Sequence, residues 1–217
     1  MAINRQKISQ MTPKGSELDP TDLMEVSVNT GLGYETRSIT GQQIISAGSY
    51  GLYTQTASST PVTNTTTETS LLDGGVGTLT VPANGFKVGD SFHAILTGHL
   101  SSVNNHTLHI RIKTDGIVLA DTGVITMAGA TSRHWKLEVY FTIRTLGVSG
   151  VASIATGGTF MYTKNASTNF EGTNFSTETI TGFDTTISNT LAITAQWGTA
   201  NTGDSIYSEI FTLNKTF

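Results

Sequence analysis

The chain has 217 residues, no cysteine, a formal net charge of −4 and only 13% charged residues, with 39 threonines and 23 glycines. This composition excludes a disulfide framework and a thiolate nucleophile, and it predicts no nucleic-acid binding, which needs a surplus of Lys and Arg. Because no run of about 18 apolar residues occurs, we expect no membrane insertion, and the N-terminus lacks the apolar segment of a secretory signal.

Residues 1–48 are predicted to form a small attachment module. Residues 22–28 and 34–39 suit two strands around a Gly-rich turn, and residues 42–46 suit one or two helical turns after a capping-box pattern. A hairpin and a short helix bury too little surface to be stable without a partner. The apolar side chains expected to dock on that partner are Leu23, Val26, Tyr34, Ile39 and Ile44.

Residues 49–64 are predicted to be a linker, and residues 65–217 the main domain. The linker carries no acidic or basic residue, is rich in Ser and Thr, and contains Pro61, which opposes a helix. This assignment divides the chain into an attachment module, a linker and a larger body.

The body has the alternating pattern of β-strands. Residues 133–144 alternate apolar and polar side chains, from Trp135 to Ile143, and residues 107–113 do the same. Asp115-Gly116 then indicates a tight hairpin turn. Further strands are expected at residues 69–72, 78–81, 91–100, 117–120, 124–127, 151–162, 175–181, 191–197 and 205–217. About ten short strands predict an all-β sandwich of the jelly-roll type with both tryptophans in its core.

The last strand carries apolar residues at both parities, which predicts burial of both faces. Ile206 and Ile210 fall on one face, and Tyr207, Phe211 and Leu213 on the other. The second face is covered either by loops of the same chain or by another copy, and we expect a contact between copies.

His109, Arg111 and Lys113 share one parity of a predicted strand. They could bind an anionic glycan or phosphate, and the alternative is a solvated strand face whose charges discourage edge pairing.

No metal, cofactor or catalytic activity is expected. The five histidines lack the spacing of converging ligands, and no nucleophile elbow is present. Glu171, Glu178 and Asp184 lie in a polar loop region without a pattern that would mark them as catalytic acids.

Several phrases in the body resemble a β-rich domain of tailed-bacteriophage virion proteins. They lie at residues 60–72, 77–84, 88–92, 135–144, 189–197 and 205–209. That domain is similar to the jelly roll of tumour necrosis factor and C1q, which commonly forms trimers. Residues 18–26 and 34–40 resemble leaders that dock phage head and tail fibres onto the particle, including those of crAss-like phages.

The resemblance implies a non-enzymatic virion protein that is assembled in the host cytoplasm. Its N-terminus would bind a capsid or tail protein, and its body would form a homotrimeric knob, with a head fibre expected rather than a tail fibre. Two alternatives stay open. One is a receptor-binding module for host carbohydrates that uses exposed Tyr140, Tyr162 or Phe170; the other is an enzyme that degrades surface glycans.

Overall fold

The computed structural model describes residues 23–31, 33–40, 50–165 and 169–217. The chain divides into two compact units, Met1–Gly48 and Ser49–Phe217. The predicted helical turns at residues 42–46, and Ile44 with them, lie outside the described residues. The described part of the chain is all β, with no helix.

The first unit contains the predicted hairpin. Strands β1 (Leu23–Asn29) and β2 (Tyr34–Thr40) pair antiparallel along their full length. The turn is closed by the Thr30 amide, which donates to the Gly33 carbonyl at 2.9 Å. Gly31 has a φ of 81°, a left-handed conformation that glycine adopts without steric cost.

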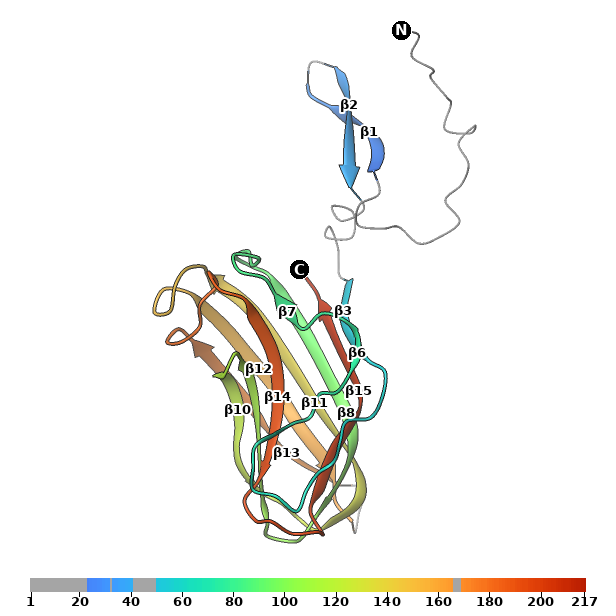
Figure 1. The fold of residues 1–217 in the computed structure, drawn as a ribbon, viewed down its shortest axis with the longest axis vertical. Helices are drawn as coiled ribbons and strands as arrows, with labels where there is room; N and C mark the ends of the chain where they lie inside the picture. Colours follow the sequence, from blue (N-terminus) through green and yellow to red (C-terminus); the bar gives the residue numbers. More distant parts are fainter. Residues whose placement is uncertain (1–22, 32, 41–49, 166–168) are drawn as a thin grey trace, which may run out of the picture. The chain divides into compact units, whose positions relative to one another are not determined.

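The second unit is built from two sheets in a sandwich-like arrangement (Figure 1). The eight-stranded sheet has the order β13 (Phe170–Thr179), β12 (Ser153–Thr163), β11 (Ala130–Thr145), β8 (Ser91–Ser102), β15 (Ser205–Lys215), β3 (Tyr50–Gln55) and β6 (Gly75–Gly77), with β4 (Val62–Thr63) also paired to β15. The five-stranded sheet has the order β10 (Ile117–Thr126), β9 (Thr107–Thr114), β14 (Asn189–Trp197) and β5 (Thr69–Ser70), with β7 (Thr80–Val81) also paired to β14.

The strand pairs are nested in sequence. The early strand β3 pairs with the last strand β15, and β5 and β7 pair with β14. Inside them β8 pairs with β11, and β9 pairs with β10. Strands β12 and β13 extend the larger sheet beyond β11.

The predicted alternation is confirmed in the core. In β11 the residues from Trp135 to Ile143 at odd positions are buried, and in β9 Leu108, Ile110 and Ile112 are buried. The indole nitrogen of Trp135 donates to the Tyr207 carbonyl at 3.1 Å. Both tryptophans lie in the core, as predicted. The indole N–H of Trp197 donates to the Val62 carbonyl, so both buried N–H groups have hydrogen-bond partners inside the fold.

The predicted turn between β9 and β10 is also confirmed. Asp115 and Gly116 have φ values of 43° and 88°. Two consecutive positive φ values match the twist of the flanking strands in a two-residue hairpin, which explains the Asp-Gly pair.

The predicted linker at residues 49–64 is wrong, since β3 and β4 lie in this segment and pair with β15. Buried Gln55 donates to the Ser208 hydroxyl at 3.1 Å, and the Ser208 amide donates to the hydroxyl of buried Ser59 at 2.9 Å. Two polar side chains of this uncharged segment are thus hydrogen bonded inside the fold.

The predicted two-faced last strand is also wrong, because β15 contains a β-bulge. Its register with β8 shifts between Ser208 and Ile210. The extra residue reverses the parity, so Ile206, Phe211 and Leu213 all point into the core and are buried. Of the five predicted interface residues, only Tyr207 and Ile210 lie on the outer face, with Ile210 57% exposed.

Candidate functional sites

The predicted cationic patch on β9 is compensated by carboxylates of the same chain. Arg111 and Lys113 lie 3.1 and 2.8 Å from the two carboxylate oxygens of Glu68. The Lys113 hydrogen bond is the main cause that lowers the pKa of Glu68. His109 lies 3.4 Å from Asp121. The three side chains are together, as the parity predicted, but they present little uncompensated charge to an anionic ligand.

The outer face of the larger sheet carries a group of side chains around Glu138. Its carboxylate accepts hydrogen bonds from Lys136 Nζ at 2.6 Å and from the Tyr140 hydroxyl at 2.7 Å, and it lies 2.8 Å from His93 Nε2. These contacts, with Lys136 the largest contribution, lower the pKa of Glu138 to about 2. The imidazole of His93 stacks on the Tyr140 ring at 4.4 Å. Tyr140 is thus exposed but held in one orientation.

A second aromatic group on the same face surrounds the outward residues of β15. The rings of His99 and His134 lie 4.1 Å apart, and the ring of Tyr207 lies 6.1 Å from that of His99. His99 Nδ1 is 3.0 Å from Glu209 Oε2, at the β-bulge. Together with Ile210 these side chains form the outer aromatic group. This group thus contains both predicted interface residues that lie on the outer face, Tyr207 and Ile210.

A shallow hollow of about 230 Å³ lies over β12 and β13. Phe170, 69% exposed, and Met161 contribute apolar surface, while Thr159 and Asn174 contribute polar groups. Gly172 pairs with Met161 across the two strands, and the backbone of β12 approaches it too closely for a larger residue. Such a mixture of one exposed ring and small polar groups can bind a sugar ring.

Tyr162, the third aromatic residue predicted to be exposed, is buried. Its hydroxyl accepts a hydrogen bond from the Ala128 amide at 2.7 Å and donates to Glu171 at 3.1 Å. Burial, followed by the nearby Glu171 charge, raises the pKa of Tyr162 to about 12. The residue is part of the core and cannot form a sugar platform.

The acids considered for catalysis are each paired separately, and Glu171 and Glu178 lie on strand β13, not in the predicted loop region. Glu178 lies 3.1 Å from Arg144, and Glu171 lies 3.1 Å from Lys164. Asp184 accepts hydrogen bonds from the Thr186 side chain and amide, which lower its pKa. Among the described residues, no three His, Asp or Glu side chains converge as metal ligands would.

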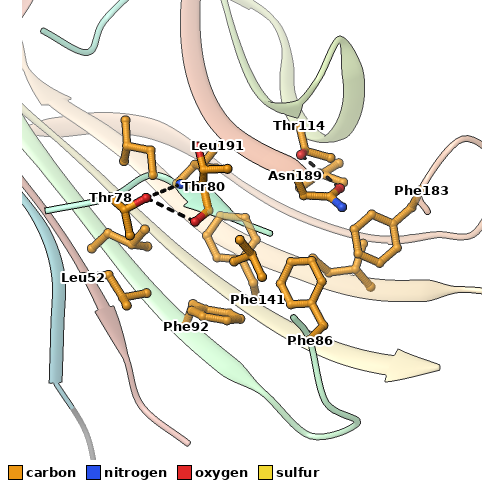
Figure 2. Close-up of a pocket in the computed structure, with 15 residues that line it drawn as sticks. Leu52, Thr78, Thr80, Phe86, Phe92, Thr114, Phe141, Phe183, Asn189 and Leu191 are labelled. Carbon is orange, nitrogen blue, oxygen red and sulfur yellow. Dashed lines mark hydrogen bonds between the residues drawn. The ribbon is translucent and has the colours of Figure 1, made fainter. Parts of the chain in front are cut away.

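Sequence reasoning missed an apolar cavity between the two sheets (Figure 2). Its walls come from both sheets and from the loops that carry Phe86 and Phe183. These two rings lie 6.0 Å apart, and Figure 2 shows them on one side of the cavity with Leu52 and Thr78 on the other. The sequence indicates this cavity only through single apolar residues, Phe86 and Phe183, in the polar loops between strands.

No protein-family model matches the chain, and no curated protein matches it. The part of the chain that the structure describes contains no helix able to span a membrane.

Proposed function

We propose that the chain is a non-enzymatic display protein of a tailed-phage virion, with residues 1–48 bound to the particle and the β-sandwich presented on its surface. The observation that carries the proposal is the division into a two-stranded hairpin unit and a much larger sandwich unit. An isolated two-stranded hairpin is marginally stable in water, so this unit requires a partner.

The exposed apolar side chains of the hairpin support an attachment role. Leu23 is 71% exposed and Met24 is 42% exposed, while Val26 and Ile39 are half-buried. By the register, Met24, Val26 and Ile39 share one face, and Leu23 lies on the other. A capsid protein, for a head fibre, or a tail protein would cover this surface.

The nested strand pairs support the jelly-roll type for the sandwich. Folding one long hairpin so that β3 meets β15 and β8 meets β11 is the connectivity of a double Greek key. In this description β12 and β13 are a hairpin added beyond β11.

The outer aromatic group supports the homotrimer. After correction for the bulge, Tyr207 and Ile210 are the predicted interface residues that remain on the surface, beside His99 and His134. Aromatic residues are enriched in the cores of protein interfaces. Light scattering of the full chain is expected to give three times the 23.0 kDa protomer mass.

Deletion of residues 1–48 in the phage that encodes the chain tests attachment. Purified particles are expected to lose the protein, while the deleted chain still accumulates in the lysate with the circular dichroism of a β-sandwich. The matched point variant is Met24→Asp, whose control is Val118→Asp on β10, since Met24 is 42% and Val118 39% exposed. Particles that retain the deleted chain would refute the attachment role.

A carbohydrate-binding module is the second candidate, favoured by the hollow beside Phe170. Replacement of Phe170 with Ala should abolish retention on a glycan array without a change in melting temperature, because the side chain is exposed. An array on which the unmodified protein binds no glycan would remove this candidate.

A further inference from the structure

A short segment crosses the open side of the cavity, where the two sheets separate. Residues 78–81, here called the strap, pass from the larger sheet to the smaller one. The Thr78 amide donates to the Leu52 carbonyl of β3 at 2.8 Å, and the Leu191 amide of β14 donates to the Leu79 carbonyl at 2.9 Å. The strap is therefore fixed to both sheets and spans the gap between them.

The space beneath the strap is small and partly open. The cavity volume is about 80 Å³. Phe92, Phe141 and Leu119 on its inner side are buried, whereas Leu52 and Leu79 at the strap are half-buried. The entrance thus lies at the strap, and the aromatic rings form the closed end.

The walls offer no free polar partner. Thr114 donates to the Asn189 side-chain oxygen at 3.2 Å, and the Asn189 side-chain nitrogen donates to the Asp184 carbonyl at 2.7 Å. At the strap, the Thr80 amide donates to the Thr78 hydroxyl at 3.0 Å, and the Thr80 and Thr190 hydroxyls are 2.9 Å apart. Among the residues that the structure describes, no charged side chain lines the cavity.

The apolar walls determine which chemical groups the cavity can hold. A polar or charged group inside would lose its hydration without gaining a hydrogen bond, which costs several kcal/mol. Empty cavities lined by apolar side chains stay dry and can bind small hydrocarbons. We propose that the cavity binds the aliphatic tail of a small amphiphile, whose polar head stays in water outside the strap. This inference is independent of the proposed display function.

Calorimetric titration of the full-length protein with 1-butanol, 1-hexanol and 1-octanol tests the proposal. Binding is expected to saturate at one site per chain and to tighten about fourfold for each added methylene until the cavity is full. The heat capacity change should be negative, since apolar surface leaves water.

Two variants locate the site. Leu191→Phe fills the cavity and should abolish binding of 1-hexanol, while its control Leu146→Phe, the same change at an exposed loop residue, should bind as the unmodified protein does. Phe86→Ala enlarges the cavity and should extend the alcohol length at which affinity stops rising. Melting temperatures verify that each variant folds.

Two results would overturn the proposal. One is titration without saturation for all three alcohols. The other is unchanged affinity in both Leu191→Phe and Phe86→Ala, which would place alcohol binding on another apolar surface, such as that around Ile210. Phe86→Ala alone decides the matter if Leu191→Phe does not fold.

Discussion

His106 Nδ1 lies 2.6 Å from an oxygen of Asp204, a carboxylate with no exposed surface. The other carboxylate oxygen accepts the Val103 amide at 2.8 Å, and the Asp204 carbonyl accepts the Thr63 hydroxyl at 2.6 Å. Asp204 therefore joins the β8–β9 turn to the start of β15 and to β4, three segments far apart in the sequence.

Replacement of Asp204 with Ala is predicted to destabilise the sandwich by about 3 kcal/mol, because the His106 ring and the Val103 amide lose their buried carboxylate partner. Urea unfolding measures the change. The control, Asp73→Ala, removes an exposed carboxylate and should change the free energy of unfolding by under about 0.5 kcal/mol. Equal effects of both substitutions would show that the buried contacts contribute nothing specific.

The lowered pKa of Glu138 predicts that the free energy of unfolding falls in acid. Its pKa is about 2 in the folded chain, against 4.5 as the ordinary value. A depressed folded pKa means that the contribution to stability is present above pH 4.5 and disappears as the pH falls toward 2. The lowered pKa values of Glu68 and Asp184 act in the same direction.

The free energy of unfolding, measured from pH 6 to pH 2 in the unmodified protein and in Glu138→Gln, isolates this contribution. The difference between the two proteins should shrink as the pH falls below 4.5. Glu25→Gln, at an exposed position in the hairpin unit, is the control and should leave the free energy of unfolding of the sandwich unchanged. A constant difference between the unmodified protein and Glu138→Gln would contradict the assignment.

The parts of the fold that could be predicted depend on local pattern. From Trp135 to Ile143 of β11, apolar residues point into the core and polar residues point to solvent. This alternation is visible in the sequence and was sufficient to assign these core positions. The bulge near Glu209 could not be found in this way, because the register of β15 is set by its partner β8. The cavity depends on how the loops around Phe86 and Phe183 meet, which no local pattern records.

The bulge itself predicts opposite outcomes for two adjacent residues. Phe211→Ala should cost about 3–5 kcal/mol, because it opens a cavity in the core, whereas Ile210→Ala should cost under about 0.5 kcal/mol in the protomer. Chemical denaturation of both variants tests the parity. Similar losses of unfolding free energy for the two substitutions would mean that both faces of β15 are buried, as the sequence alone predicted.

Gly98 of β8 lies against the bulge, and this contact gives the last prediction. A methyl group at Gly98 would overlap the Tyr207 carbonyl oxygen and approach the Ser208 Cα to 2.9 Å. The same carbonyl accepts the hydrogen bond from the indole of Trp135. Because the atoms in contact are backbone, they cannot move without shifting β15.

Gly98→Ala is therefore predicted to destabilise the protein by roughly 1–3 kcal/mol, the usual cost of overpacking. Near-ultraviolet circular dichroism should change with it, since the environment of Trp135 is disturbed. The matched control is Gly129→Ala, where the nearest atom, Asn104 Cβ, is 3.8 Å away and an added methyl group makes only ordinary contact. A Gly98→Ala variant as stable as Gly129→Ala would mean that β15 approaches β8 less closely at the bulge than the structure has it.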